Sequence, residues 1–341
     1  MPFILQLPLS FYRKANAVFL RLSAMGLLSV LITSSCTKEI QGNLPDPELK
    51  LVVDANIETN TPPLVLLTKT SKVFGGLNLN DLSGFFEHDA EIWIKDANGL
   101  DSVKLVEYCL KDLPFPDSTK ADLLKGLGII AYDSNAVPNV CAYTVPDIIA
   151  YYTTGTCAFF GKEEHSYDMT IKTATRYLTA STTIPKSLGG IDSLSYVRHP
   201  KPENDTLVTV LVHINVPPTI GNFSRYWTKR NGQPFYPPQS QSVYDDKLFA
   251  GQSLSLPLER GQPTTDNKQT DPTYGFFWRG DTVTLKWSNI DYRTYDFFYT
   301  LENDGSGNPF ANQVKVKSNV NGGIGVFAGY ATRYYSIIVP K

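Results

Sequence analysis

Hydrophobic and polar residues alternate with a period of two along most of this chain, which is the pattern of β-strands that bury one face. The alternating segments are rich in Val, Ile, Thr and aromatic residues and are bounded by Asn, Asp, Gly and Pro. In the first half the predicted strands are 49–58, 63–70, 90–95, 103–110, 140–145, 167–173 and 177–183. In the second half they are 191–198, 207–216, 223–230, 253–259, 282–288 and a final set within 313–339. The pattern predicts a mostly β protein.

Two segments depart from this alternation and predict short helices. The first lies near 117–128, where Asp117 takes the N-cap position and leucines recur on one face. The second lies near 291–303. The residues that recur there at helical spacing are Tyr292, Tyr295, Phe298, Tyr299 and Leu301. We expect this aromatic face to pack against a sheet.

A stretch containing Pro and two Gly residues at 185–190 separates the two groups of strands. Each group is long enough to bury a core of its own. The sequence therefore predicts two tandem antiparallel β-sandwich domains, Ig-like or prealbumin-like, each with a short helical insert. Their predicted bounds are 48–185 and 190–341.

The N-terminal end has the features of an export signal. Basic residues precede an apolar run at 22–35, which is shorter than the about 20 residues of a membrane-spanning helix. The run ends in Ile32-Thr33-Ser34-Ser35-Cys36, which resembles a bacterial lipobox although Thr33 stands where the strict box has Leu. We predict a lipoprotein signal peptide over 1–35 and lipid on Cys36. An ordinary signal peptide with a chance cysteine is the alternative.

Acyl chains on Cys36 would hold the protein at a membrane without a spanning helix, since each buried methylene contributes about 0.8 kcal/mol. The segment 36–47 contains one Gly and two Pro and is predicted to be a flexible, lipid-anchored tether. Lys38-Glu39, just after the cysteine, resembles the charged signals that send some lipoproteins to the outer face of the outer membrane. We therefore expect an outer-membrane location, with the cell-surface and the periplasmic face both open.

Composition and cysteine content narrow the possible functions. A net charge of −2 with no basic cluster gives no support for nucleic-acid binding. After Cys36 three cysteines remain, an odd number, which predicts one disulfide and one free thiol in an oxidising compartment. We favour Cys109 with Cys141 over Cys141 with Cys157. Closing that loop would contribute about 3 to 4 kcal/mol.

Searches for catalytic and metal-binding motifs give no support for an enzyme. GxSxG, HExxH, the P-loop and GxGxxG after a strand are all absent from the sequence. The four histidines are scattered without metal-pair spacing, and Asp245-Asp246 has no regular oxygen ligands around it that would suggest calcium. We predict a noncatalytic protein with no cofactor and no metal.

Four residues are candidates for ligand binding, with their exposure as the deciding observation. They are Arg225, Tyr226, Trp227 and Trp278. If the aromatic residues, with Phe277, line one concave face, ligand capture is favoured. If they are all buried, they belong to the core.

The two ends of the mature chain resemble a known family. Its C-terminal features are Gly307-Asn308-Pro309-Phe310, Ser318-Asn319-Val320 and the run from Gly322 to Tyr330. Leu51-Val52-Val53-Asp54-Ala55 and the run from Tyr177 to Pro185 are similar to the family's opening domain. The chain thus resembles domain-of-unknown-function family 4249, an uncharacterised family of Bacteroidetes outer-membrane lipoproteins. Physically, the glycines at 322–325 predict a strand bend or a close backbone approach, with Phe327 and Tyr330 packed beyond it.

The resemblance implies a partner, because members are commonly encoded beside TonB-dependent receptors. The expected function is an accessory lipoprotein that assists such a receptor in capturing or taking up a nutrient ligand. A surface adhesion module without a transporter is the alternative, and a glycan-active enzyme is the third possibility.

Five Asp-Ser or Asp-Thr steps resemble acceptors of Bacteroidetes O-glycosylation. The candidate hydroxyls are Ser102, Ser118, Ser193, Thr206 and Thr282. The same dipeptides also occur where a turn enters a strand, so both interpretations stay open.

Overall fold

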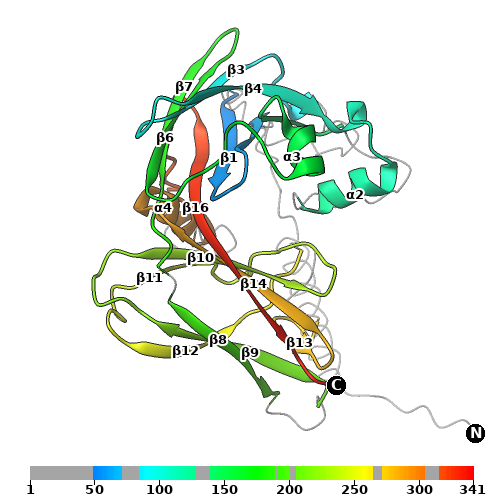
Figure 1. The fold of residues 1–341 in the computed structure, drawn as a ribbon, viewed down its shortest axis with the longest axis vertical. Helices are drawn as coiled ribbons and strands as arrows, with labels where there is room; N and C mark the ends of the chain where they lie inside the picture. Colours follow the sequence, from blue (N-terminus) through cyan, green and yellow to red (C-terminus); the bar gives the residue numbers. More distant parts are fainter. Residues whose placement is uncertain are drawn as a thin grey trace, which may run out of the picture. The chain divides into compact units, whose positions relative to one another are not determined.

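The computed structural model describes residues 49–70, 84–126, 139–188, 190–199, 205–263, 271–303 and 315–341 (Figure 1). These residues belong to one compact unit, Glu48–Lys341. The predicted signal peptide, the tether and Cys36 lie outside the described residues. Within the described ranges, no helix combines the length and the apolar character needed to cross a membrane.

The described elements confirm a mostly β protein. Those of the first half are β1 (Leu51–Glu58), β2 (Leu64–Lys69), β3 (Glu91–Asp96), β4 (Ser102–Cys109), η2 (Leu110–Asp112), α2 (Asp117–Gly126), β5 (Cys141–Thr144), α3 (Ile148–Thr154), β6 (His165–Lys172) and β7 (Tyr177–Ile184). Those of the second half are β8 (Ile191–Arg198), β9 (Leu207–Asn215), β10 (Phe223–Arg230), β11 (Val243–Asp245), β12 (Ser253–Leu258), β13 (Phe277–Trp278), β14 (Thr282–Ile290), α4 (Tyr292–Glu302), β15 (Val320–Asn321) and β16 (Ile324–Ile338).

The strands form one large and one small sheet. The large sheet has the order β11-β10-β14-β16-β1-β2-β5-β4-β3-β6-β7-β15. In the small sheet β9 pairs with β8 on one side and with β12 and β13 on the other. The expectation of purely antiparallel pairing is wrong for β1 and β16, which run parallel over Val52–Glu58 and Ile324–Tyr330. The large sheet is therefore mixed.

The long strand β16 joins the two groups of strands. Its first half pairs with β1, and its second half, Ala331–Ile338, pairs antiparallel with β14. In Figure 1 this strand, in red, runs from beside β1 to beside β14. The C-terminal strand β16 is therefore hydrogen-bonded to strands of both groups. The two tandem sandwich domains with bounds 48–185 and 190–341 stay a prediction.

Two glycines let β16 approach its neighbours closely, as expected from the glycine-rich stretch. A Cβ on Gly329 would lie 2.6 Å from the carbonyl oxygen of Thr183 in β7, so the sheet curls until β7 packs against β16. Gly325 has φ +119 and its missing side chain leaves room for the backbone of Val53. Beyond Gly325, Phe327 and Tyr330 are buried.

The inward positions of the strands fill two main cores. Leu51, Val53, Ala55 and Ile57 of β1 point into the first core. The second core lies between the small sheet and β10 and β14, and its central residues include Val210, Tyr226 and Leu285.

Helix α4 is present as predicted, and its buried face agrees with the predicted one in part, since Phe298 is buried and Tyr295 packs against a core cluster. It buries Thr294, Phe297, Phe298 and Thr300, whereas Tyr292, Tyr299 and Leu301 are exposed. The reason is the entry angle, because Asp291 caps the helix and also accepts hydrogen bonds from Thr182 Oγ1 (3.0 Å) and Thr183 N (2.9 Å). This anchor on β7 turns the Phe297-Phe298 side toward the sheet.

The structure joins Cys109 and Cys141 in a disulfide, the pairing that the sequence favours. The two residues are directly opposite in the antiparallel pair of β4 and β5. Cys157 is a free thiol.

Candidate functional site

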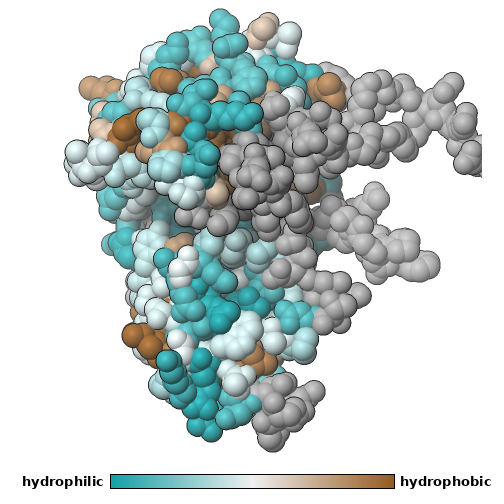
Figure 2. Space-filling model, turned by 90° about the vertical axis from the view of Figure 1, so that its right-hand side faces the viewer, coloured by the Kyte–Doolittle hydropathy of each residue, from teal (hydrophilic) through white to brown (hydrophobic). Residues whose placement is uncertain are grey.

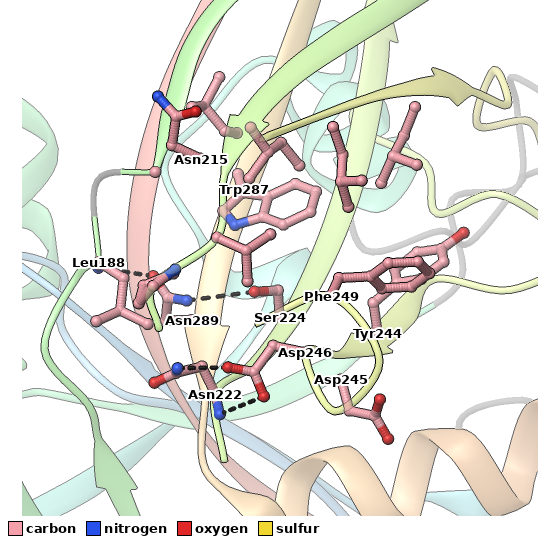
Figure 3. A pocket seen from close by; sticks show the side chains of 17 residues that line it. Leu188, Asn215, Asn222, Ser224, Tyr244, Asp245, Asp246, Phe249, Trp287 and Asn289 are labelled. Atoms are coloured by element: carbon pink, nitrogen blue, oxygen red, sulfur yellow. Dashed lines mark hydrogen bonds between the residues drawn. The ribbon is translucent and has the colours of Figure 1, made fainter. Parts of the chain in front are cut away.

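The candidate site is a pocket at one end of the second core, between the small sheet and the strands β10 and β14 (Figure 3). On one side, Ile191, Ile214, Leu254 and Leu256 come from β8, β9 and β12. On the other side Trp287 continues the inward row of β14. Alternation places these apolar side chains inside, so the pocket is a part of the core that opens to solvent.

The polar end of the pocket is built by two loops that are fastened together. Buried Asp246 accepts hydrogen bonds from Gly221 N (2.9 Å), Asn222 N (3.1 Å) and Asn222 Nδ2 (2.5 Å). Gly221 has φ +102, a backbone conformation that favours glycine. These bonds hold the loop before β10 against the loop after β11.

Asn289 and Ser224 close the inner end of the pocket. Asn289 ends the inward row of β14, accepts a hydrogen bond from Leu188 N (3.0 Å) and donates one to Ser224 Oγ (3.2 Å). Asp245 points away from the pocket toward α4 (Figure 3), where its carboxylate accepts a hydrogen bond from Tyr295 OH (3.3 Å). Burial and this carboxylate raise the pKa of Tyr295 to about 12.

Hydrophobic side chains stand exposed beside the pocket mouth. Ile220 is 65% exposed, Leu248 76% and the pocket-lining Phe249 40%. Asp246 holds the loops that carry them. The face shown in Figure 2 is mainly hydrophilic, with hydrophobic residues in small separate patches. An apolar rim next to an apolar pocket is typical of a binding surface.

The size of the pocket decides what it can hold. Its volume is about 90 Å³, whereas pockets for small-molecule ligands measure about 300 to 1,000 Å³. A volume of this size accepts one apolar side chain or a ligand fragment of similar size. Asp245 and Asp246 are the charged residues among the described lining, but Asp245 is directed toward α4 and Asp246 is buried, so the open part of the pocket is mainly apolar.

The structure does not bring the four ligand candidates together on one face. Tyr226 is buried in the second core, where burial raises its pKa and its ring stacks on Tyr244 and Trp287. Trp278 lies apart, half-buried between the guanidinium groups of Arg230 (4.0 Å from the ring centroid) and Arg260 (4.8 Å). Phe277 is fully buried. The aromatic candidates therefore do not line one concave face.

Arg225 and Trp227 do lie together, on the face of β10 opposite the pocket. The Arg225 guanidinium stacks on Phe298 (3.3 Å to the ring centroid) and Trp227 (4.7 Å). It also donates hydrogen bonds to Ser242 Oγ (2.9 Å) and Tyr330 OH (3.2 Å). These contacts connect β10, α4 and β16, so Arg225 has a structural role here.

A family model with the description "Domain of unknown function (DUF4249)" matches residues 37–336. The chain belongs to this family. No curated protein matches it. The match spans both groups of strands and covers the residues of the pocket, its two loops and most of β16.

The remaining sequence candidates of this DUF4249 protein have clear positions. The five glycosylation candidates, Ser102, Ser118, Ser193, Thr206 and Thr282, are all exposed. They stay predictions. Sequence reasoning missed the pocket because its lining comes from separate strands and loops. Its one local signal is Asn289, a polar residue that ends the row Val283, Leu285 and Trp287.

Proposed function

We propose that this protein is a lipid-anchored, noncatalytic accessory protein of the outer membrane that docks on a TonB-dependent receptor and assists nutrient uptake. The observation that carries the proposal is the small apolar pocket with its exposed rim of Ile220, Leu248 and Phe249. In this proposal the rim and pocket form the docking surface.

The volume of the pocket favours a protein partner over a free nutrient. One Leu, Ile or Phe side chain inserted by a partner fills about 90 Å³ much better than a nutrient-sized molecule does. A buried apolar anchor surrounded by contacts that exclude water is the usual centre of a protein interface.

The lipid predicted on Cys36 would make a weak docking interaction sufficient. Confinement of both proteins to one membrane raises their effective concentration, so a small surface suffices for a working complex. The proposed order is anchoring, docking through the pocket, and transfer of the nutrient to the receptor.

Site-specific photocrosslinking in the native membrane tests this proposal. A photoreactive residue at position 248 of the full chain is expected to crosslink to a TonB-dependent barrel, identified by mass spectrometry. Position 100 is the matched control, because Leu100 is fully exposed but belongs to the β3–β4 turn. Crosslinks from position 248 to glycans or host proteins, with no barrel, would instead establish the adhesion module.

A second experiment separates docking from anchoring. Leu248→Asp should remove copurification of the barrel and keep the protein in the membrane fraction. Cys36→Ser should release the protein from that fraction. If the barrel copurifies undiminished with Leu248→Asp, the pocket rim is not the docking surface.

A further inference from the structure

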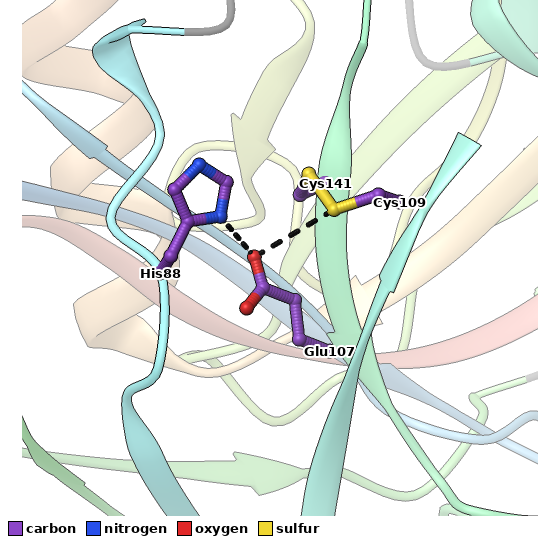
Figure 4. Close-up of side chains that lie close together, drawn as sticks. All are labelled: His88, Glu107, Cys109 and Cys141. Atoms are coloured by element: carbon purple, nitrogen blue, oxygen red, sulfur yellow. Dashed lines mark hydrogen bonds and ion pairs between the residues drawn. A yellow bond between two sulfur atoms is a disulfide. The ribbon is translucent and has the colours of Figure 1, made fainter. Parts of the chain in front are cut away.

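Four potential metal-binding side chains from three segments of the chain meet beside a small buried cluster that includes Phe86 and Leu110 (Figure 4). They are His88, Glu107, Cys109 and Cys141, and one ligand atom of each lies within 4.8 Å of the others. Glu107 Oε1 lies 2.5 Å from His88 Nδ1 and 3.9 Å from Cys109 Sγ. Figure 4 shows this carboxylate oxygen directed toward both.

The position of His88 is fixed by the fold. The Tyr143 hydroxyl donates a hydrogen bond to Glu87 O (2.9 Å) and accepts one from Ala90 N (3.1 Å). Both residues that Tyr143 holds flank His88, and Tyr143 itself belongs to β5, as does Cys141. The strand that supplies one sulfur thus also fixes the histidine segment.

The Glu107 carboxylate is held by the same segment that carries His88. Asp89 N donates a hydrogen bond to Glu107 Oε2 (3.3 Å). The other carboxylate oxygen, Oε1, is therefore directed toward His88 and the sulfurs. Asp89 has φ +57, a left-handed conformation that a residue other than Gly adopts at an energetic cost. Strained backbone of this kind is concentrated at functional sites.

We propose that these four residues form a zinc site that alternates with the disulfide. In the disulfide state only the imidazole of His88 and the carboxylate of Glu107 are available as ligands. When the disulfide is reduced, two thiolates complete a set of two sulfurs, one nitrogen and one oxygen. Four such ligands suit tetrahedral Zn²⁺.

The change in geometry is small. At Zn–S distances of about 2.3 Å, the two sulfurs of a tetrahedral site lie about 3.8 Å apart. Cys109 and Cys141 are opposite each other on adjacent strands, so rotation of the two side chains supplies this separation. His88 is partly exposed and gives the ion a path from solvent, since 46% of its side chain is accessible.

The conversion needs a dithiol reductant. The dithiol transfers two electrons and two protons to the disulfide, which gives two cysteine thiols and leaves the reductant as a cyclic disulfide. Zn²⁺ then binds both sulfurs as thiolates, and two protons pass to water. In the reverse step the cyclic disulfide takes two electrons from the two thiolates and two protons from water, which gives back the dithiol, restores the disulfide of the protein and releases the ion.

Cobalt binding to the full chain in detergent tests the proposal. After reduction with excess dithiol and its removal under argon, Co²⁺ should bind at one ion per chain. The spectrum should show the charge-transfer band of thiolate ligands and the visible bands of tetrahedral Co²⁺, and added Zn²⁺ should abolish both. His88→Ala and Glu107→Gln should each weaken Co²⁺ binding at least 10-fold.

The controls separate this site from other thiols and from unfolding. The oxidised protein should give no thiolate band, and Cys157→Ser should bind as the wild type does. If reduction lowers the melting temperature, Zn²⁺ should raise it again for the wild type and not for His88→Ala. The proposal is overturned if the reduced chain binds no more Co²⁺ than the oxidised chain. Binding that His88→Ala and Glu107→Gln leave unchanged would also overturn it. Neither result bears on the docking surface.

Discussion

The ion pair of Glu58 and Lys286 gives the sharpest test of how the two groups of strands are held together. Glu58 ends β1, Lys286 lies in β14, and β16 runs between them. The ion pair therefore crosses β16, whose Tyr330 lies opposite Glu58 and whose Tyr334 lies opposite Lys286. Its Nζ lies 2.5 Å from Glu58 Oε2 and 6.0 Å from the ring centroid of Tyr330. Only 18% of the Lys286 side chain and 11% of the Glu58 side chain are exposed.

Lys286→Met should destabilise the protein strongly, because it leaves the Glu58 carboxylate buried with one remaining side-chain hydrogen bond among the described residues, from Tyr334 OH (3.1 Å). Removing one partner of a buried pair costs about 3 to 5 kcal/mol. The double variant Glu58→Gln, Lys286→Met removes both charges, so its cost should be lower than that of Lys286→Met alone. The expected coupling free energy is about 2 to 3 kcal/mol.

Urea unfolding of the full chain in detergent, followed by tryptophan fluorescence, measures these free energies. The exposed pair of Lys104 and Glu91, with nitrogen and oxygen 3.7 Å apart, is the matched control. Lys104→Met should change stability by less than about 0.5 kcal/mol. The reasoning is refuted if Lys286→Met costs less than about 1 kcal/mol, or if the costs of the single variants simply add.

Three further predictions test other parts of the fold. Replacing Cys109 and Cys141 by Ser should lower the free energy of unfolding by about 3.7 kcal/mol, the loop entropy for a separation of 32, while Cys157→Ser changes it little in the same urea assay. Asp291→Ala should cost about 2 to 3 kcal/mol and reduce helical circular dichroism, because the cap of α4 and two bonds to β7 are lost together, whereas Asp291→Asn retains part of them. Burial raises the pKa of Tyr330 to about 12 in the folded protein. The neutral form is therefore favoured by folding, so this contribution to stability is complete below pH 10 and is lost as the pH rises toward 12. Between pH 10 and pH 12, Tyr330→Phe should lose less stability than the wild type. Equal losses in the two proteins would contradict the raised pKa of Tyr330.

Strand positions could be predicted from local pattern because each strand needs only one buried face. The predicted segments 191–198 and 223–230 coincide with β8 and β10. Helix α3 was missed, since its sequence Ile-Ile-Ala-Tyr-Tyr-Thr-Thr favours strand by composition. It ends at Gly155, whose φ of +76 fits the left-handed cap of a helix. None of its residues is buried, and Ile148 is the one that packs against the first core among the described residues.

The candidate sites were much less predictable than the strands. Glu107 and Cys109 alternate on β4 and so share a face, which was the local signal for the cluster. His88 and Cys141 join them only through pairing between distant segments. The same holds for the pocket, whose walls come from two sheets.

The sequence by itself determined the period-two strands, the presence of α2 and α4, and the family, because these depend on short-range chemistry and on motifs. Tertiary structure alone decided that β16 runs parallel to β1 and then continues beside β14. It also decided which face of α4 is buried, and which acids, sulfurs and apolar side chains become neighbours. The physical reason is that a strand's own residues specify its two faces, but its partners follow from packing across the whole chain.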